Sequence, residues 1–114
     1  MQPLAPRKFE ELVGQALDDL PAGMVEPVSN LVLVVEDEHT CEPDLLGLYE
    51  GVPLTERDVY SGALPDRVTL YRIPLCLHAE DLDDLAREVR VTVVHELAHH
   101  MGIAETRLHE LGWG

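Results

Sequence analysis

The stretch His95-Glu96-Leu97-Ala98-His99 constrains the fold of this 114-residue chain more than any other. Histidines four positions apart lie on one face of an α-helix, about 6 Å apart along its axis, so both imidazoles can bind one tetrahedral zinc ion. The glutamate after the first histidine can then reach water on that metal. Only fifteen residues follow His99 (114 minus 99), so any ligand from beyond the helix must come from a short tail.

The motif falls in a predicted long helix that runs from about residue 80 to Met101. Acidic residues in its first turn suit the positive end of the helix dipole, and Gly102 suits the C-terminal cap. On a helical wheel one apolar arc must face the core: Leu82, Leu85, Ala86, Val89, Val93 and Leu97. A second arc carries both motif histidines and three polar residues, Asp84, Glu88 and Thr92. We expect this polar stripe to form the floor of a solvated cleft.

Glu96 lies between the two arcs, where its carboxylate can lean toward water on the zinc without becoming a ligand. Zinc lowers the pKa of such a water to about 7, so a carboxylate can act as general base and then pass the proton to a leaving amine. His100 falls on the apolar arc, turned away from His99. We expect His100 to be a partly buried histidine with a backbone hydrogen bond rather than a ligand.

The third metal ligand has three candidates in the tail: Glu105, His109 and Glu110. Gly102 permits a left-handed turn, after which the chain can double back and bring residue 105 toward the metal. We therefore favour Glu105 and keep the other two as alternatives. The competing role for Glu105 is to begin a short tail helix, Glu105–Leu111, at its positive end.

The remaining elements are predicted from periodicity and breaker residues. An amphipathic helix is expected over Phe9–Leu20, ended by Pro21 and Gly23. Three strands are expected over Leu31–Val35, Leu45–Glu50 and Val68–Ile73, the last closed by Pro74, with loops at 36–44 and 52–66. A helix, three strands and a long helix together predict an α+β domain.

Composition narrows the class of protein. With 46% apolar residues and no repeat or linker, residues 1–114 are predicted to form one domain. The net charge of −14 disfavours nucleic acid and membranes as partners, because so acidic a surface repels both. No run reaches the roughly 18 apolar residues of a membrane helix, and Met1 to Arg7 lacks an apolar stretch of signal-peptide type. We expect a soluble, cytoplasmic protein in which Cys41 and Cys76 are free thiols.

Taken with the residues around it, the motif resembles the zincin-like metallopeptidase family of small bacterial proteins. The resemblance rests on three groups of residues: His95 to Glu105 with Leu108 to Trp113, Phe9 to Pro21, and Leu46 to Pro53 with Leu64 to Tyr71. It implies a minimal zincin-like fold, with a small three- to four-stranded sheet packed on an N-terminal helix and a long active-site helix. It also implies zinc bound by His95 and His99, with Glu96 as the catalytic carboxylate.

The chain departs from the family pattern HExxHxxGxxD at its last position, where Glu105 replaces the aspartate. Glutamate is one methylene longer, so it either ligates after a small shift or misses the metal. No methionine follows Glu105 to form the methionine turn of metzincins, and Trp113 is the large residue that could fill that place.

These residues predict a zinc-dependent metallopeptidase that cleaves a peptide or unfolded protein bound in extended form along a sheet edge. No side chain is clearly assigned to stabilise the oxyanion. The remaining candidates, by exclusion only, are the tyrosines Tyr49, Tyr60 and Tyr71. The alternative is a non-catalytic metal- or peptide-binding domain that keeps the zincin fold. The oligomeric state stays open, a homodimer included.

Overall fold

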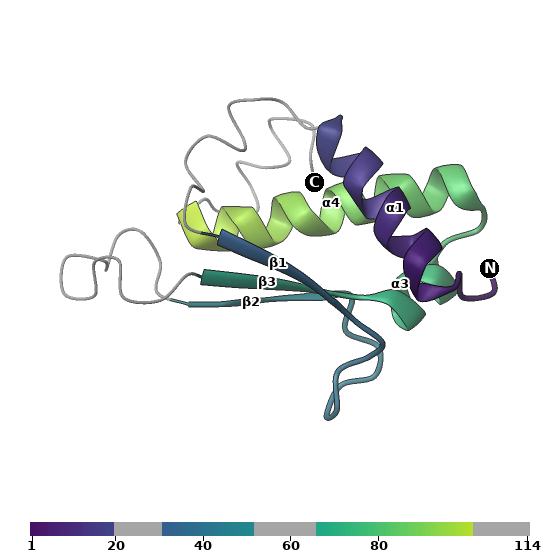
Figure 1. The fold of residues 1–114 in the computed structure, drawn as a ribbon. Coiled ribbons are helices and arrows are strands. Elements are labelled where there is room, and N and C mark those ends of the chain that lie inside the picture. The colour runs from purple at the N-terminus through teal and green to yellow at the C-terminus, as the bar shows by residue number, and fades with distance from the viewer. Residues whose placement is uncertain (20–30, 52–65, 102–114) are drawn as a thin grey trace, which may run out of the picture.

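The computed structural model describes residues 1–19, 31–51 and 66–101. Three strands form one sheet, and α1 and α4 lie over one of its faces (Figure 1). The elements in chain order are α1 (Pro6–Asp18), β1 (Leu31–Glu36), β2 (Gly47–Glu50), β3 (Asp66–Tyr71), α3 (Arg72–His78) and α4 (Leu82–Met101). This arrangement confirms the predicted α+β class, with its N-terminal helix, small sheet and long helix carrying the HExxH motif.

The sheet is mixed and has the strand order β1-β3-β2. β1 runs parallel to β3, with Leu31 opposite Asp66, and β2 runs antiparallel to it, with Gly47 opposite Leu70. Among the described strands β2 pairs with β3 alone, so it lies at one edge of the described sheet. Because side chains alternate along a strand, the two sheet faces carry different residues. Val68 and Leu70 face the helices, and the alternate residues Arg67, Thr69 and Tyr71 point the other way.

The core lies between the sheet and the helices. Its buried residues come from α1 (Phe9, Val13, Ala16), β3 (Leu70), α3 and the segment after it (Leu75, Cys76, Ala79) and α4 (Leu85, Val89, Val93, Val94, Leu97, Ala98). Four residues of the predicted apolar arc of α4 are buried: Leu85, Val89, Val93 and Leu97. Ala86 is only half-buried, and Leu82 is 54% exposed. Val94 and Ala98 are also buried, because α4 contacts α1 as well as β2 and β3. Of the two thiols, both free, Cys76 is buried and Cys41 is exposed.

The predicted end of the third strand is wrong. Arg72 and Ile73 begin helix α3 instead of extending β3, and Pro74 is the third residue of that helix. Proline is tolerated there because backbone N–H groups in the first turn have no acceptor within the helix. Arg72 is held in place by distant groups: its guanidinium donates to the carbonyl of Leu4 at 2.6 Å and pairs with Asp37 at 2.9 Å.

Other boundaries differ by one to three residues, among them the start of β3, which is Asp66 rather than Val68. α1 begins at Pro6 rather than Phe9, since proline suits the first position of a helix. β2 begins at Gly47 rather than Leu45. The predicted cap Gly102 and tail helix Glu105–Leu111 lie outside the described residues.

Two aspartates form hydrogen bonds at the N-terminus of α4. The Asp81 carboxylate accepts a hydrogen bond from the Asp84 N–H at 2.8 Å, as an N-cap residue does. The Asp84 carboxylate accepts one from the Glu80 N–H at 2.9 Å. This bond, followed by one from Arg87, lowers the pKa of Asp84 below its ordinary value. The acidic first turn therefore fixes where the helix begins.

None of the described helices combines the length and apolar character needed to cross a membrane.

Candidate active site

The HExxH motif lies in the last turns of α4, which is continuous from Leu82 to Met101. His95 and His99 are therefore four residues apart on one unbroken helix, and their backbones share a face as predicted. The side chains of His95 and Glu96 are half-buried. The side chains of His99 and His100 lie outside the described part, as do Glu105, His109, Glu110 and Trp113.

Glu96 is placed by a close approach between α4 and strand β2 at Gly47. A Cβ atom built on Gly47 would lie 2.6 Å from Cγ2 of Thr92 and 3.6 Å from Cγ of Glu96. The strand backbone thus packs directly on the helix, and the stem of Glu96 passes over it. A glycine inside a strand can signal such an approach, and this signal was present in the sequence at Gly47.

This contact corrects one prediction about the polar stripe on α4. Thr92 is only 7% exposed, so it lies beneath β2 and is not part of a solvated floor. Glu88, further upstream, is paired with Arg87 at 2.9 Å and His78 at 3.6 Å. Asp84 is also paired with Arg87, at 3.0 Å. The stripe is therefore an ion-pair network that ends in a buried threonine next to Glu96.

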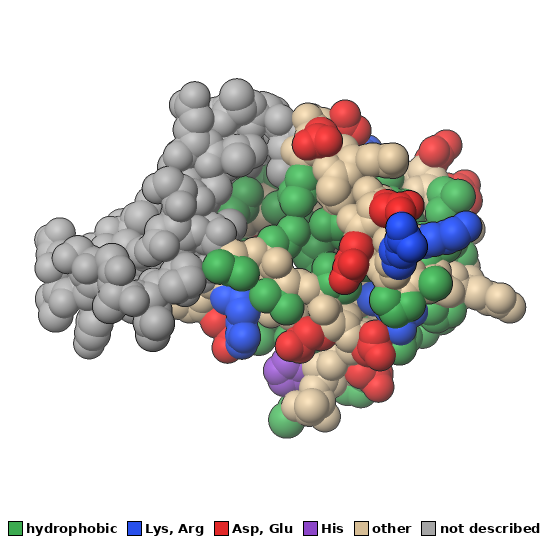
Figure 2. Space-filling model, viewed as in Figure 1, with side chains coloured by type: hydrophobic (Ala, Val, Ile, Leu, Met, Phe, Trp, Pro, Cys, Tyr) green, Lys and Arg blue, Asp and Glu red, His purple; other side chains and the backbone are tan. Residues whose placement is uncertain are grey.

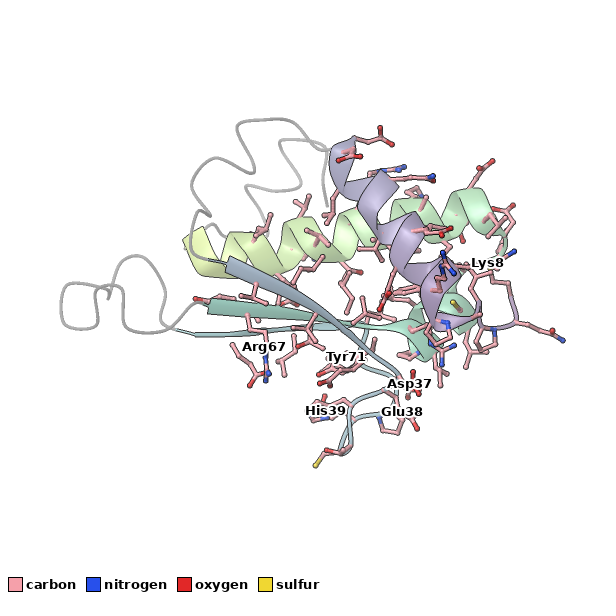
Figure 3. All side chains as sticks on the ribbon, viewed as in Figure 1. Lys8, Asp37, Glu38, His39, Arg67 and Tyr71 are labelled. Carbon is pink, nitrogen blue, oxygen red and sulfur yellow. The ribbon has the colours of Figure 1, made fainter. Side chains whose placement is uncertain are left out.

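The sheet separates the tyrosines predicted for the oxyanion. Tyr49 is two residues from Gly47 on the same strand, so it projects from the face that packs on α4. Tyr71 projects from the opposite face together with Arg67 (Figure 3), edge-on to the ring of His39 at a centroid distance of 5.8 Å. Burial, followed by the charge of Glu36, raises the pKa of Tyr71 above its ordinary value. Tyr60 lies outside the described residues, so Tyr49 is the candidate that the described sheet places on the side of Glu96.

Comparison with known proteins agrees with this geometry. The sequence profile of one family, described as zincin-like metallopeptidase, matches residues 24–113, most of the chain. The chain belongs to the zincin-like metallopeptidase family. A solved structure, a conserved hypothetical protein from Thermus thermophilus, is 27% identical with a TM-score of 0.55, and the match covers 95% of this chain and 97% of that one. No curated protein matches the chain.

The donor atoms of this zincin-like protein suit zinc. Two imidazoles four residues apart on a continuous helix, with a carboxylate as the third ligand, form a common zinc donor set. Among the described side chains no group of three or more His, Cys, Asp and Glu residues could hold a metal ion. Of the four residues predicted for metal binding and catalysis, however, that part of the chain includes the side chains of His95 and Glu96 alone. The metal site thus stays a prediction, supported by the helix that carries both histidines.

Proposed function

We propose that this protein is a zinc-dependent peptidase in which His95, His99 and Glu105 bind the metal and Glu96 is the catalytic carboxylate. The observation that carries the proposal is the packing of Glu96 over Gly47 of β2. This packing places the only carboxylate of the motif beside a strand whose outer edge has no partner among the described strands. An extended peptide that added to this edge would bring its backbone to Glu96.

Each residue of the proposed site would have a separate role in hydrolysis. β2 would bind the substrate backbone through main-chain hydrogen bonds and so hold the scissile carbonyl near Glu96. The Glu96 carboxylate would take a proton from the attacking water and return it to the leaving amine. Tyr49, on the same sheet face as Gly47, would donate a hydrogen bond to the developing oxyanion. Zinc, when bound, would polarise the water and the scissile carbonyl.

Metal content and hydrolysis test the proposal in separate steps. The purified wild-type protein is expected to take up about one zinc per chain by elemental analysis, as a three-ligand catalytic site does. His95→Ala with His99→Ala should abolish uptake, because two of the three ligands are lost. Glu96→Gln should retain zinc and lose hydrolysis of a peptide library. Unchanged zinc content in the double variant would show that the metal lies elsewhere.

A non-catalytic peptide-binding domain is the second candidate, because the β2 edge could bind peptides without any chemistry. The two candidates differ in one measurement. Zinc-loaded wild-type protein that binds peptides from the library and cleaves none would contradict the peptidase and support the binding domain.

A further inference from the structure

A pocket of about 380 Å³ lies where α3 meets the connection between β1 and β2. Its apolar walls are formed by Pro43 and Leu46 from that connection and by Ile73, Pro74 and Leu77 from α3. Leu77 is 63% exposed, so this wall of the pocket is open to solvent. The walls suit an aliphatic chain that enters from solvent.

The rim of the pocket is acidic. Glu38 and Asp44 line it, and within the described part of the chain neither carboxylate forms an ion pair. Figure 3 shows Glu38 on the connection that follows β1, beside Asp37 and His39. A ligand with a positive end and an apolar stem matches both the walls and the rim, as lysine and arginine side chains do.

The chain has few cations that could neutralise this rim. The described arginines Arg7, Arg67, Arg72, Arg87 and Arg90 each pair with a carboxylate elsewhere. On the face shown in Figure 2, basic side chains likewise lie beside acidic ones. Within the described residues no lysine or arginine lines the pocket, and its one basic side chain, His78, pairs with Glu88, so a cationic ligand would meet both carboxylates unpaired.

The pocket adjoins the strand and helix that hold Glu96. Leu46 directly precedes β2, and His78 on the rim pairs with Glu88 of α4 at 3.6 Å. Glu88 lies eight residues before Glu96 on α4, about 12 Å along the helix axis. The pocket is therefore connected to both elements that position Glu96, β2 through Leu46 and α4 through His78.

We propose that this pocket binds the lysine or arginine side chain of a peptide that lies along β2, at a position away from the bond that is cleaved. The substrate class is thus a basic peptide. The carboxylates at the pocket select it, rather than the negative charge spread over the whole protein. The position relative to the cleaved bond rests on the proposed peptidase function. The binding of the basic side chain does not.

Peptide binding to the Glu96→Gln protein tests the pocket without cleavage. The probes are three fluorescein-labelled peptides of alternating valine and threonine that differ at one position, which is lysine, glutamine or glutamate. By fluorescence anisotropy at low salt, the lysine peptide should bind about three- to tenfold more tightly than the glutamine peptide. The glutamate peptide should bind most weakly, and the preference should shrink as salt rises.

Two double variants with equal charge changes locate the effect. Glu38→Gln with Asp44→Asn should abolish the preference for lysine. Glu10→Gln with Asp18→Asn, exposed carboxylates on α1 with no described ion pair, should preserve it. An equal loss in both double variants would overturn the proposal, because diffuse charge would then explain the preference. So would the same affinity for all three peptides.

Cleavage by zinc-loaded wild-type protein is measured separately and keeps the two proposals apart. Charge-dependent binding with no cleavage would support the pocket and contradict the peptidase. Cleavage with no charge preference would contradict the pocket alone.

Discussion

Replacing Gly47 with alanine should destabilise the protein and displace Glu96. The new Cβ would lie 2.6 Å from Cγ2 of Thr92, about 0.8 Å closer than an ordinary van der Waals contact of 3.4 Å (3.4 minus 2.6). The carbonyl oxygen of Thr69, at 3.3 Å, restricts movement of the strand. Threonine has only two common χ1 rotamers in a helix, so either the Thr92 side chain changes rotamer in a buried site or α4 shifts. Overpacking of this kind costs about 1–3 kcal/mol of unfolding free energy.

Backbone strain at position 47 does not contribute to this predicted loss of stability. Gly51 is the described glycine with positive φ, at 152°, so Gly47 has a conformation that alanine can adopt. The cost is therefore steric. For a chain of this size the melting temperature should fall by about 4 °C per kcal/mol, that is by about 4–12 °C. Chemical denaturation gives the free energy directly.

A second substitution tests whether Thr92 is the cause. Thr92→Ser removes the clashing methyl group and alone should cost about 1 kcal/mol. If the overlap is responsible, the double variant should be more stable than the sum of the two single effects by about 1 kcal/mol or more. Strict additivity in this double-mutant cycle would refute the steric explanation.

The remaining predictions concern two other sites. Gly14 lies exposed in the middle of α1, and no atom beyond its chain neighbours and the adjacent helix backbone lies within 4 Å of the position that an added methyl group would take. Gly14→Ala should therefore raise stability by about 0.5–1 kcal/mol in the same denaturation assay, and a loss would contradict the open surface. Tyr71 has a raised pKa in the folded state, so its stabilising contribution is complete below pH 10, the unfolded value, and is lost as pH rises through the folded value. The free energy of unfolding, measured with urea at increasing alkaline pH, should fall more steeply for wild type than for Tyr71→Phe. Equal slopes would refute the raised pKa of Tyr71.

Local pattern was sufficient to predict most of the elements. The 3.6-residue spacing of Phe9, Val13 and Ala16 marks α1, and the apolar run in β1 marks a strand. The long helix with both motif histidines also follows from spacing and from its acidic first turn. These features depend on neighbouring residues, which the sequence displays directly.

Contacts between distant residues could not be predicted in this way. Helix α3 was missed because its first residue is held by Leu4 and Asp37, which are far away in the chain. The burial of Thr92 depends on Gly47, 45 positions earlier (92 minus 47), and nothing near Thr92 indicates it. The pocket combines α3 with the β1–β2 connection, so neither segment reveals it alone.

The parts of the HExxH motif thus depend on different levels of structure, and Gly47→Ala can separate them. The spacing of His95 and His99 is set by the helix itself, so a shift of α4 moves both histidines together and should leave zinc content near that of wild type. The position of Glu96 relative to a bound peptide depends on the packing of α4 on β2. A displacement near 1 Å can reduce turnover about a hundredfold. Gly47→Ala should therefore retain zinc and lose most hydrolysis, and Thr92→Ser should restore part of that hydrolysis. Loss of zinc together with hydrolysis would instead show that β2 also supports the metal site.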